Sequence, residues 1–341
     1  MIYVSTKTAV ALLAAIVALV YYPIVFNGWA YEDPRMLGGL LLPIDWSSAL
    51  RPSRLLSNLS FKATAALTEQ PNPTVFHAAS VAIHLLNCAL IGVLSHKLGA
   101  RTWLAAVLFA VNPVVVEAVV YAAARTDLIA TTFTLTACLS VAGCRSTPPL
   151  SRLLTATFAV WLTLISKESA AGVILVVPIV WLYSDPGLEW RKLTVIGIPI
   201  LVVSAYAFYH RPVWPEAADS VLDYTWVEYA SYQAGTIYDL AARTLIPLSL
   251  TADFDAAALS PLIRYFALLI VVAVLPIYAF TSPRRSYPVL FAIAFAVASV
   301  APRFLVRTNE WVSEHHFYLA VAGIAMAVSV KLEEYVGRKT R

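Results

Sequence analysis

Long apolar stretches recur along the whole chain and constrain its fold more than any other feature. Of the 341 residues, 60% are hydrophobic and only 13% are charged, and the mean hydropathy of +0.74 lies far from the range of soluble proteins. A helix needs about 20 mainly apolar residues to cross a bilayer. The pattern predicts an all-α polytopic membrane protein forming a single integral membrane domain over residues 1–341. We expect about ten spans (nine to eleven), near 8–27, 74–96, 102–121, 127–144, 152–166, 169–184, 193–209, 261–280, 286–302 and 314–332.

The distribution of basic residues predicts the orientation, because Lys and Arg in short loops favour the cytoplasmic side. With both termini cytoplasmic, thirteen of the 24 basic residues and four of the 20 acidic residues lie inside. We therefore expect a multi-pass protein of the plasma membrane with its functional site on the outer face. The basic residues assigned to the inner side are Lys7, Lys97, Arg101, Arg145, Arg152, Arg191, Lys192, Arg284, Arg285, Lys331, Arg338, Lys339 and Arg341.

Two predicted outer loops, the first and the fourth, are long. In the first, residues 28–73, leucines alternate with Arg and Lys between Trp46 and Leu67, which is typical of a helix lying in the membrane interface. In the second, residues 210–260, the apolar stretch 226–245 is interrupted by charged residues. We interpret it as an interfacial or re-entrant helix, although an eleventh span is the alternative.

Ionisable residues lie at the predicted outer ends of several spans, where they are costly unless they face a cavity or a partner. Each alone can be a snorkelling side chain or a structural ion pair, but their gathering on one side favours a site. Glu117 and Arg125, eight residues apart on one expected helical run, should share a face. The set comprises Glu32, Asp33, Glu117, Arg125, Asp127, Lys167, Glu168, Glu314, His315 and His316.

The remaining polar residues suggest structural roles. His77, His84 and Asn87 on the second span favour hydrogen bonds between helices over metal ligation. The three cysteines, Cys88, Cys138 and Cys144, fall within or at the ends of spans and form no disulfide framework or zinc site. We expect no metal-ligand residues and no nucleic-acid partner.

Several short motifs, in order along nearly the whole chain, resemble the membrane domain of the transmembrane and tetratricopeptide-repeat O-mannosyltransferases. These are GT-C glycosyltransferases that use a polyprenyl-phosphate sugar. The matching motifs are Tyr31-Glu32-Asp33, Arg51-Pro52, His77 with His84-Leu85-Leu86-Asn87, Ala106 to Pro113 with Glu117-Ala118-Val119 and Arg125-Thr126-Asp127, Ser166-Lys167-Glu168, Pro247-Leu248-Ser249-Leu250 with Asp253, and Glu314 with Tyr318-Leu319.

The resemblance implies a GT-C-like fold and assigns roles to these residues. Asp33 would be the catalytic base, with Glu32 as its neighbour or substitute, since adjacent carboxylates can exchange this role. Cations stabilise the departing phosphate, and carboxylates orient them or bind sugar hydroxyls. The implied donor-binding residues are Arg51, Glu117, Arg125, Asp127, Lys167, Glu168, Glu314 and His315.

The chain also departs from the family pattern. Asn112 stands where the family usually has His, the second His expected near Val115 is missing, and His315 stands where an Arg usually follows the late Glu. The tetratricopeptide repeats do not follow the last span. These departures put donor binding and acceptor recognition in doubt.

The sequence therefore predicts an inverting glycosyltransferase that moves a hexose, mannose or similar, from a polyprenyl phosphate to an acceptor hydroxyl of a protein or glycan on the non-cytoplasmic face. No cofactor is certain, and a divalent metal remains possible. The alternative is a catalytically weakened relative that serves as a structural subunit beside other membrane subunits. A secondary transporter is disfavoured, because nothing in the sequence indicates paired halves with broken helices at the membrane midplane.

Overall fold

The computed structural model describes residues 5–30, 33, 54–68, 71–100, 103–144, 148–185, 190–209, 224–247, 259–280, 288–304 and 313–339. Over these ranges the protein is helical and contains no strand. Its elements are α1 (Thr6–Tyr21), η1 (Tyr22–Phe26), α4 (Leu55–Ala65), α5 (Pro73–Lys97), α6 (Leu104–Ala110), η3 (Pro113–Val115), α7 (Val116–Val120), η4 (Ala122–Ala124), α8 (Arg125–Val141), α9 (Leu150–Leu164), η5 (Glu168–Gly172), α10 (Val173–Ser184), α11 (Trp190–Tyr209), α13 (Trp226–Leu245), α14 (Pro261–Phe280), α15 (Pro288–Val300), η7 (Ala301–Phe304) and α16 (Glu314–Lys339).

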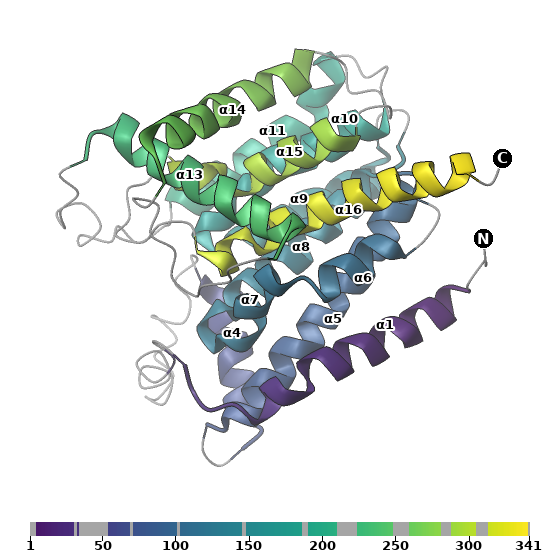
Figure 1. Cartoon of the computed structure of the whole chain (residues 1–341), viewed down its shortest axis with the longest axis vertical. Helices are drawn as coiled ribbons and strands as arrows, with labels where there is room; N and C mark the ends of the chain where they lie inside the picture. Colours follow the sequence, from purple (N-terminus) through teal and green to yellow (C-terminus); the bar gives the residue numbers. More distant parts are fainter. Residues whose placement is uncertain are drawn as a thin grey trace.

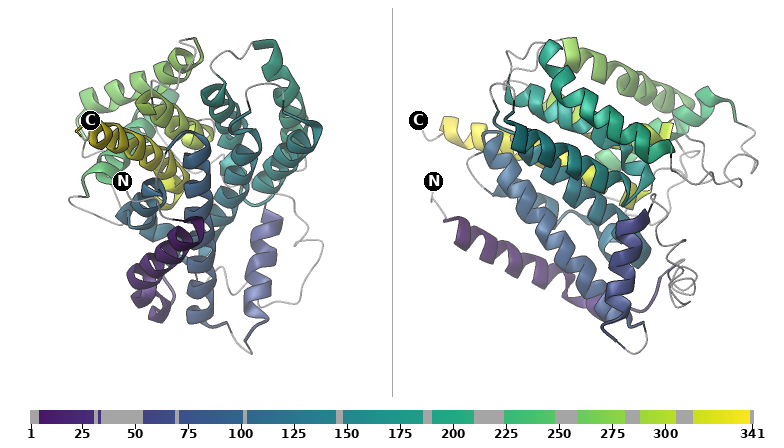
Figure 2. Two further views of the ribbon diagram at one scale, coloured as in Figure 1. Left: turned by 90° about the vertical axis from the view of Figure 1, so that its right-hand side faces the viewer. Right: turned by 180° about the vertical axis from the view of Figure 1, so that it is seen from behind.

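The long helices form a bundle whose two chain ends lie at the same end (Figure 1). The first turns of α5, α8 and α16 lie at the opposite end, which we call the site end; the views in Figure 2 agree. Helix α8 lies inside the bundle, where it contacts α5, α9, α10 and α16. Residues on several of its faces, such as Leu128, Leu135 and Cys138, are fully buried. Its N-terminus is therefore surrounded by other elements, which makes it the natural place for a site.

Helix starts follow local capping chemistry. Asn72 accepts a hydrogen bond from Thr74 N and precedes Pro73, the first residue of α5. Proline is suited to this position because the first helical N–H groups have no partner within the helix. Thr225 and Glu228 form a reciprocal capping box at the start of α13. These side chains satisfy backbone groups that would otherwise need water.

The expected continuous span over residues 102–121 is wrong. The chain forms α6, then the short η3 and α7, and the break falls at Asn112 and Pro113. Proline disfavours the helical conformation of the residue before it, and Asn112 is extended, with φ −71° and ψ 124°. The Asn112 side chain caps the new turn through Val114 N and donates to Thr244 O, so the break is stabilised by packing against α13.

The shared helical run proposed for Glu117 and Arg125 is also wrong. Helix α7 ends at Val120, and Tyr121 is extended, with ψ 110°. The turn η4 then leads into α8, which begins at Arg125. The two residues consequently belong to different helices and contact different partners.

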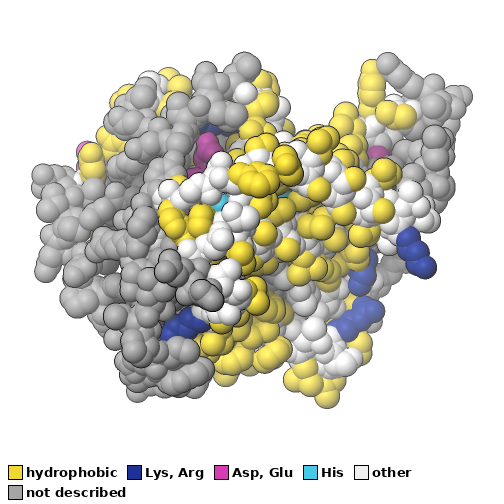
Figure 3. Space-filling view, turned by 90° about the horizontal axis from the view of Figure 1, so that it is seen from below, with side chains coloured by type: hydrophobic (Ala, Val, Ile, Leu, Met, Phe, Trp, Pro, Cys, Tyr) yellow, Lys and Arg dark blue, Asp and Glu magenta, His cyan; other side chains and the backbone are white. Residues whose placement is uncertain are grey.

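Helices occupy the other expected spans, with shifts of a few residues at their ends. Among the described residues, three segments are long and apolar enough to cross a membrane: Thr6–Phe26, Pro73–Lys97 and Pro261–Tyr278. Shorter apolar helices cover Leu150–Leu164, Glu168–Ser184, Thr194–Ala205 and Pro288–Phe304. The face seen in Figure 3 carries broad hydrophobic areas with few charged side chains among its described atoms. The chain is thus an all-helical protein with membrane-compatible helices.

The two expected interfacial segments are partly described. Helix α4 covers the second half of the segment Trp46–Leu67, while Trp46 to Ser53 lie outside the described residues. In the fourth loop, α13 matches the predicted stretch 226–245 and packs against α14 and α16. It is not among the candidate spans found in the described residues.

Candidate functional site

Two ion pairs join the first loop to the N-terminus of α8 and the connection between α9 and η5. Lys167 Nζ lies 2.5 Å from Asp127 Oδ2, and both side chains are about nine-tenths buried, with 9% and 12% of their surface exposed. The neighbouring Glu168 accepts from Arg54 Nη2 at 3.0 Å. Lys167 has extended backbone because α9 ends three residues earlier at Leu164. The short connection therefore carries two opposite charges. Together with their partners Asp127 and Arg54 they form a cluster of charged side chains.

A chain of hydrogen bonds continues this cluster across the start of α16. Arg303 donates through Nη1 to Nε2 of His316 at 2.8 Å, and the backbone N of Ser313 donates to Nδ1 of the same imidazole at 3.3 Å. Nδ1 lies 2.7 Å from Ser313 Oγ, which also lies 3.0 Å from Nδ1 of His315. His315 donates from its backbone N to Glu117 at 2.9 Å, and its Nδ1 lies 3.1 Å from the same carboxylate.

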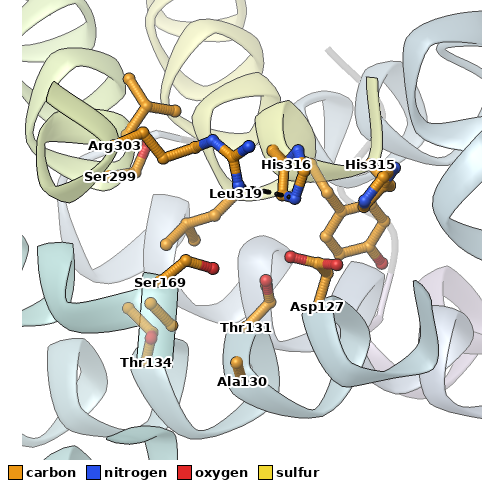
Figure 4. A pocket seen from close by; sticks show the side chains of 13 residues that line it. Asp127, Ala130, Thr131, Thr134, Ser169, Ser299, Arg303, His315, His316 and Leu319 are labelled. Atoms are coloured by element: carbon orange, nitrogen blue, oxygen red, sulfur yellow. Dashed lines mark hydrogen bonds between the residues drawn. The ribbon is translucent and has the colours of Figure 1, made fainter. Parts of the chain in front are cut away.

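Four residues of the cluster and its hydrogen-bond chain border a small cavity at the site end, namely Asp127, Arg303, His315 and His316 (Figure 4). The floor comes from α8 and η5, and Arg303 and His316 reach over it from η7 and α16. Its volume is about 30 Å³, which is room for no more than one or two water molecules. Most of the residues that line it carry a polar or ionisable group, although their apolar atoms also face the cavity: Asp127, Thr131, Thr134, Ser169, Ser299, Arg303, His315, His316 and Tyr318.

The cations and carboxylates of the cluster are equal in number. Burial lowers the pKa of Lys167, and the charges of Arg303 and Arg54 act in the same direction while Asp127 opposes them. Arg54, Lys167 and Arg303 share the cluster and its hydrogen-bond chain with three carboxylates, which are Asp127, Glu168 and Glu117. Charges in such a site interact more strongly than in bulk water, because water is partly excluded.

Arg125, predicted to bind the donor, is fully buried among the described residues of α4 and α5. Its guanidinium donates to Thr64 Oγ1 at 2.8 Å, Phe76 O at 2.7 Å and Ser80 Oγ at 3.2 Å. It also lies over the ring of Phe76, 4.9 Å from the centroid. The structure thus places Arg125 beside the cluster but turned into the protein.

Asp33, the predicted base, is fully buried. Its Oδ1 accepts from Ala123 N at 2.9 Å, and Oδ2 accepts from Ala122 N at 3.3 Å and Ala30 N at 3.1 Å. Both oxygens are therefore bound to backbone groups. Glu32 and Arg51 lie outside the described residues.

The last two predicted donor-binding carboxylates approach each other. Glu117 on α7 binds His315, as described above, while Glu314 begins α16 and lies 3.9 Å from Arg243 Nη1. Arg243 is also paired with Asp239 one turn earlier on α13, at 2.5 Å. The structure therefore joins Glu117 to His315 and Asp127 to Lys167, and of these four residues Asp127 and His315 line the cavity.

The interpretation of the polar residues on α5 as helix–helix contacts is confirmed for His84 and Asn87. His84 Nδ1 lies 2.7 Å from the hydroxyl of Tyr318, and Asn87 donates to Leu128 O at 2.9 Å. His77 instead contacts the first loop, where its Nε2 lies 3.2 Å from Gly28 O. Among the described residues, no group of three or more His, Cys, Asp or Glu is arranged to hold a metal ion.

The sequence analysis missed three residues of the cluster. Arg54 follows the Arg51-Pro52 motif by two residues, and Arg303 follows Pro302 at the end of an apolar stretch. His316 was noted among the charged groups but was not assigned to the site. A signal was present for each of them, namely a charged or ionisable residue at the site end of a span.

Comparisons with known proteins found no matching family model, no similar characterised protein and no similar solved structure.

Proposed function

We propose that this protein is a membrane-embedded, inverting glycosyltransferase that takes a hexose, such as mannose, from a polyprenyl phosphate. The acceptor is a hydroxyl group of a protein or glycan on the non-cytoplasmic face. The observation that carries the proposal is the gathering of Arg54, Lys167 and Arg303 at the end of the bundle opposite both termini. The charges of Arg54 and Arg303 act on Lys167 there, and Arg303 lines a cavity together with Asp127. A lipid phosphate has its headgroup at the membrane boundary, which is where such a cluster can meet it.

In this reaction, the acceptor oxygen forms a bond to the anomeric carbon while the bond from that carbon to the phosphate oxygen breaks. The lipid phosphate leaves with the electron pair, and the hydroxyl proton passes to a carboxylate. Lys167 and Arg303 stabilise the charge that grows on the leaving phosphate. Asp127 holds Lys167 in place, Glu168 holds Arg54, and Glu117 orients His315.

We assign the base to Glu32 rather than Asp33. Both oxygens of Asp33 accept backbone hydrogen bonds, and a base has to reach the hydroxyl whose proton it takes. Asp33 instead holds its loop against η4. This keeps the adjacent pair of carboxylates proposed for catalysis but exchanges the two roles.

A transfer assay tests the proposal. Detergent-purified protein is incubated with polyprenyl-phosphate-mannose and a peptide or glycan acceptor, and release of lipid phosphate is measured. We expect Glu32→Gln to lower turnover by roughly 10²–10⁴, the usual contribution of general acid–base catalysis, without loss of donor binding. Lys167→Met should weaken donor binding instead.

The matched control is Lys97→Met, since Lys97 lies at the opposite end of the bundle and donates to Leu139 O. Wild-type protein that neither binds the donor nor releases lipid phosphate would reject the proposal. Equal loss in Lys97→Met and Lys167→Met would remove the cluster as its explanation.

A second candidate is a structural subunit of a membrane assembly. It is favoured by the small size of the cavity and by the internal bonding of Arg125 and Asp33. Stoichiometric copurification with other membrane subunits, together with the absence of transfer, would support this function.

A further inference from the structure

The short turn η4 and the first residue of α8 hold both described ends of the first loop. At one end, Asp33 accepts from the backbone N–H groups of Ala122 and Ala123. At the other end, Arg125 donates to Thr64 and, at 3.5 Å, to Ser60, both on α4. Three residues within one stretch of four therefore contact two segments that are more than twenty residues apart.

The position of α4 in turn decides where Arg54 lies. Arg54 immediately precedes α4 and pairs with Glu168. The same end of α4 contacts the α9–η5 connection through Ser57 Oγ, which donates to Ser166 O at 2.8 Å. Arg125 acts near the other end, at Thr64. The helix is thus bound at both ends, with Arg54 at the end that contacts the α9–η5 connection.

The energetic balance supports a positioning role for Arg125. An unpaired buried guanidinium is costly, but this one donates to four protein oxygens and lies over two aromatic rings, those of Phe61 and Phe76. Burial lowers the pKa of Arg125 to about 10, and the charge of Asp33 acts against that shift. Removing one member of such a network leaves the other buried polar groups without hydrogen-bond partners. The complete network therefore holds its members rigidly in one arrangement.

We propose that Arg125 and Asp33 are positioning residues that anchor the first loop to η4 and α8, and that Arg125 acts on an anionic ligand only by fixing Arg54 beside Lys167. This rests on the proposed function for the identity of the ligand, a polyprenyl phosphate. The anchor itself is independent of that function.

The first experiment measures the position of α4 without any substrate. Spin labels are placed at Ala63 on α4 and at Leu150 on α9, both exposed, and the distance distribution is recorded by electron paramagnetic resonance. The native cysteines are buried and should not be labelled. We expect a narrow distribution in the wild type that broadens in Arg125→Met and narrows again in Arg125→Lys.

Two further variants keep this test decisive if Arg125→Met does not fold. Thr64→Val preserves volume and removes the acceptor on α4 while leaving Arg125 in place, so it should also broaden the distribution. Arg152→Met is the matched control, because Arg152 lies on α9 and contacts Cys144. Distributions as narrow as the wild type in both Thr64→Val and Arg125→Met would overturn the proposal.

The second experiment tests the route through Arg54. Binding of farnesyl phosphate is measured in wild-type protein, Arg54→Met, Arg125→Met and the double variant. We expect each single change to weaken binding roughly tenfold, as for one hydrogen bond to a charged group, and the double variant to bind no more weakly than the weaker single variant. Additive losses would show that Arg125 acts separately from Arg54 and would overturn that part of the proposal.

The outcomes also separate this inference from the proposed function. If wild-type protein does not bind farnesyl phosphate but α4 is released in Arg125→Met and Thr64→Val, the anchor stands and the glycosyltransferase proposal fails. If binding and transfer occur while α4 stays in place in both variants, the anchor fails alone.

Discussion

The ammonium group of Lys167 donates to Oδ2 of Asp127 over 2.5 Å, although the two residues are 40 positions apart. The pair joins α8, which carries Asp127, to the α9–η5 connection, which carries Lys167. Because the pair is buried, the loss of either partner should destabilise the protein. The remaining charge would then be buried without an opposite charge beside it.

Breaking this pair should destabilise the protein more than replacing it. We expect Asp127→Ala to lower stability by about 3–5 kcal/mol, as for removal of one partner of a buried pair. The double variant Asp127→Leu/Lys167→Met should recover much of that loss. Thermal unfolding in detergent measures both, and a double variant less stable than Asp127→Ala would contradict the prediction.

Stability should depend on pH through Glu314, the first residue of α16, which is not among the candidate spans. Burial and the nearby charge of Glu117 raise its pKa from 4.5 to about 7, with Asp239 acting in the same direction and Arg243 opposing. The folded state therefore favours the protonated acid. Its contribution is fully present below the unfolded pKa of 4.5 and is lost as the pH rises to about 7.

The measurement is the apparent melting temperature between pH 4.5 and 8. We expect a fall of a few degrees with rising pH in the wild type and a smaller fall in Glu314→Gln, in which position 314 cannot titrate. An identical slope in the two proteins would show that Glu314 has no such effect.

Gly172 should tolerate no side chain. A Cβ at this position would lie 2.3 Å from the carbonyl oxygen of Ala298 and 2.7 Å from that of Ser299, so backbone atoms of α15 would have to move. Gly172→Ala should therefore cost about 1–3 kcal/mol or more. Gly197→Ala on α11 is the matched control, since a Cβ there meets no atom within 4 Å. Similar thermal stability of the two variants would argue against the close approach of η5 and α15.

Labelling of engineered cysteines tests the expected orientation. Gly28 and the exposed Leu67 lie in the described part of the first loop, near the site end, while Leu150 begins α9 at the end that carries the termini. Cysteines at Gly28 and Leu67 should react with an impermeant reagent in intact cells, and one at Leu150 should not. The reverse pattern would place the cluster on the cytoplasmic side and reject a donor on the far face.

The helical character of the chain could be predicted from the sequence because it depends on local properties. Within a bilayer the backbone of a helix satisfies its own hydrogen bonds, so long apolar stretches such as 8–27 and 74–96 correspond to α1 with η1 and to α5. The exception, 102–121, failed because apolar composition conceals the effect of Pro113 on the residue before it. The effect of Pro113 on the preceding residue is local and can be predicted from the sequence, but the apolar composition of the stretch favoured a continuous span.

The membership of the candidate site could be predicted only in part. The positions of Asp127, Lys167, Glu168 and His315 at span ends indicated that they would lie at one end of the bundle. Their neighbours Arg54 and Arg303 carry the same kind of signal, but it does not separate a side chain that lines a cavity from one that faces elsewhere.

The sequence by itself determined the helices and the end of the bundle at which the charges gather, because hydropathy and the alternation of spans depend on position along the chain. Only the tertiary structure decided which charges meet. Glu117 and His315 are 198 positions apart and contact each other, whereas Arg125, two residues from Asp127, is buried against α4 and α5. The rotation of each helix about its axis and its packing against distant helices select such partners.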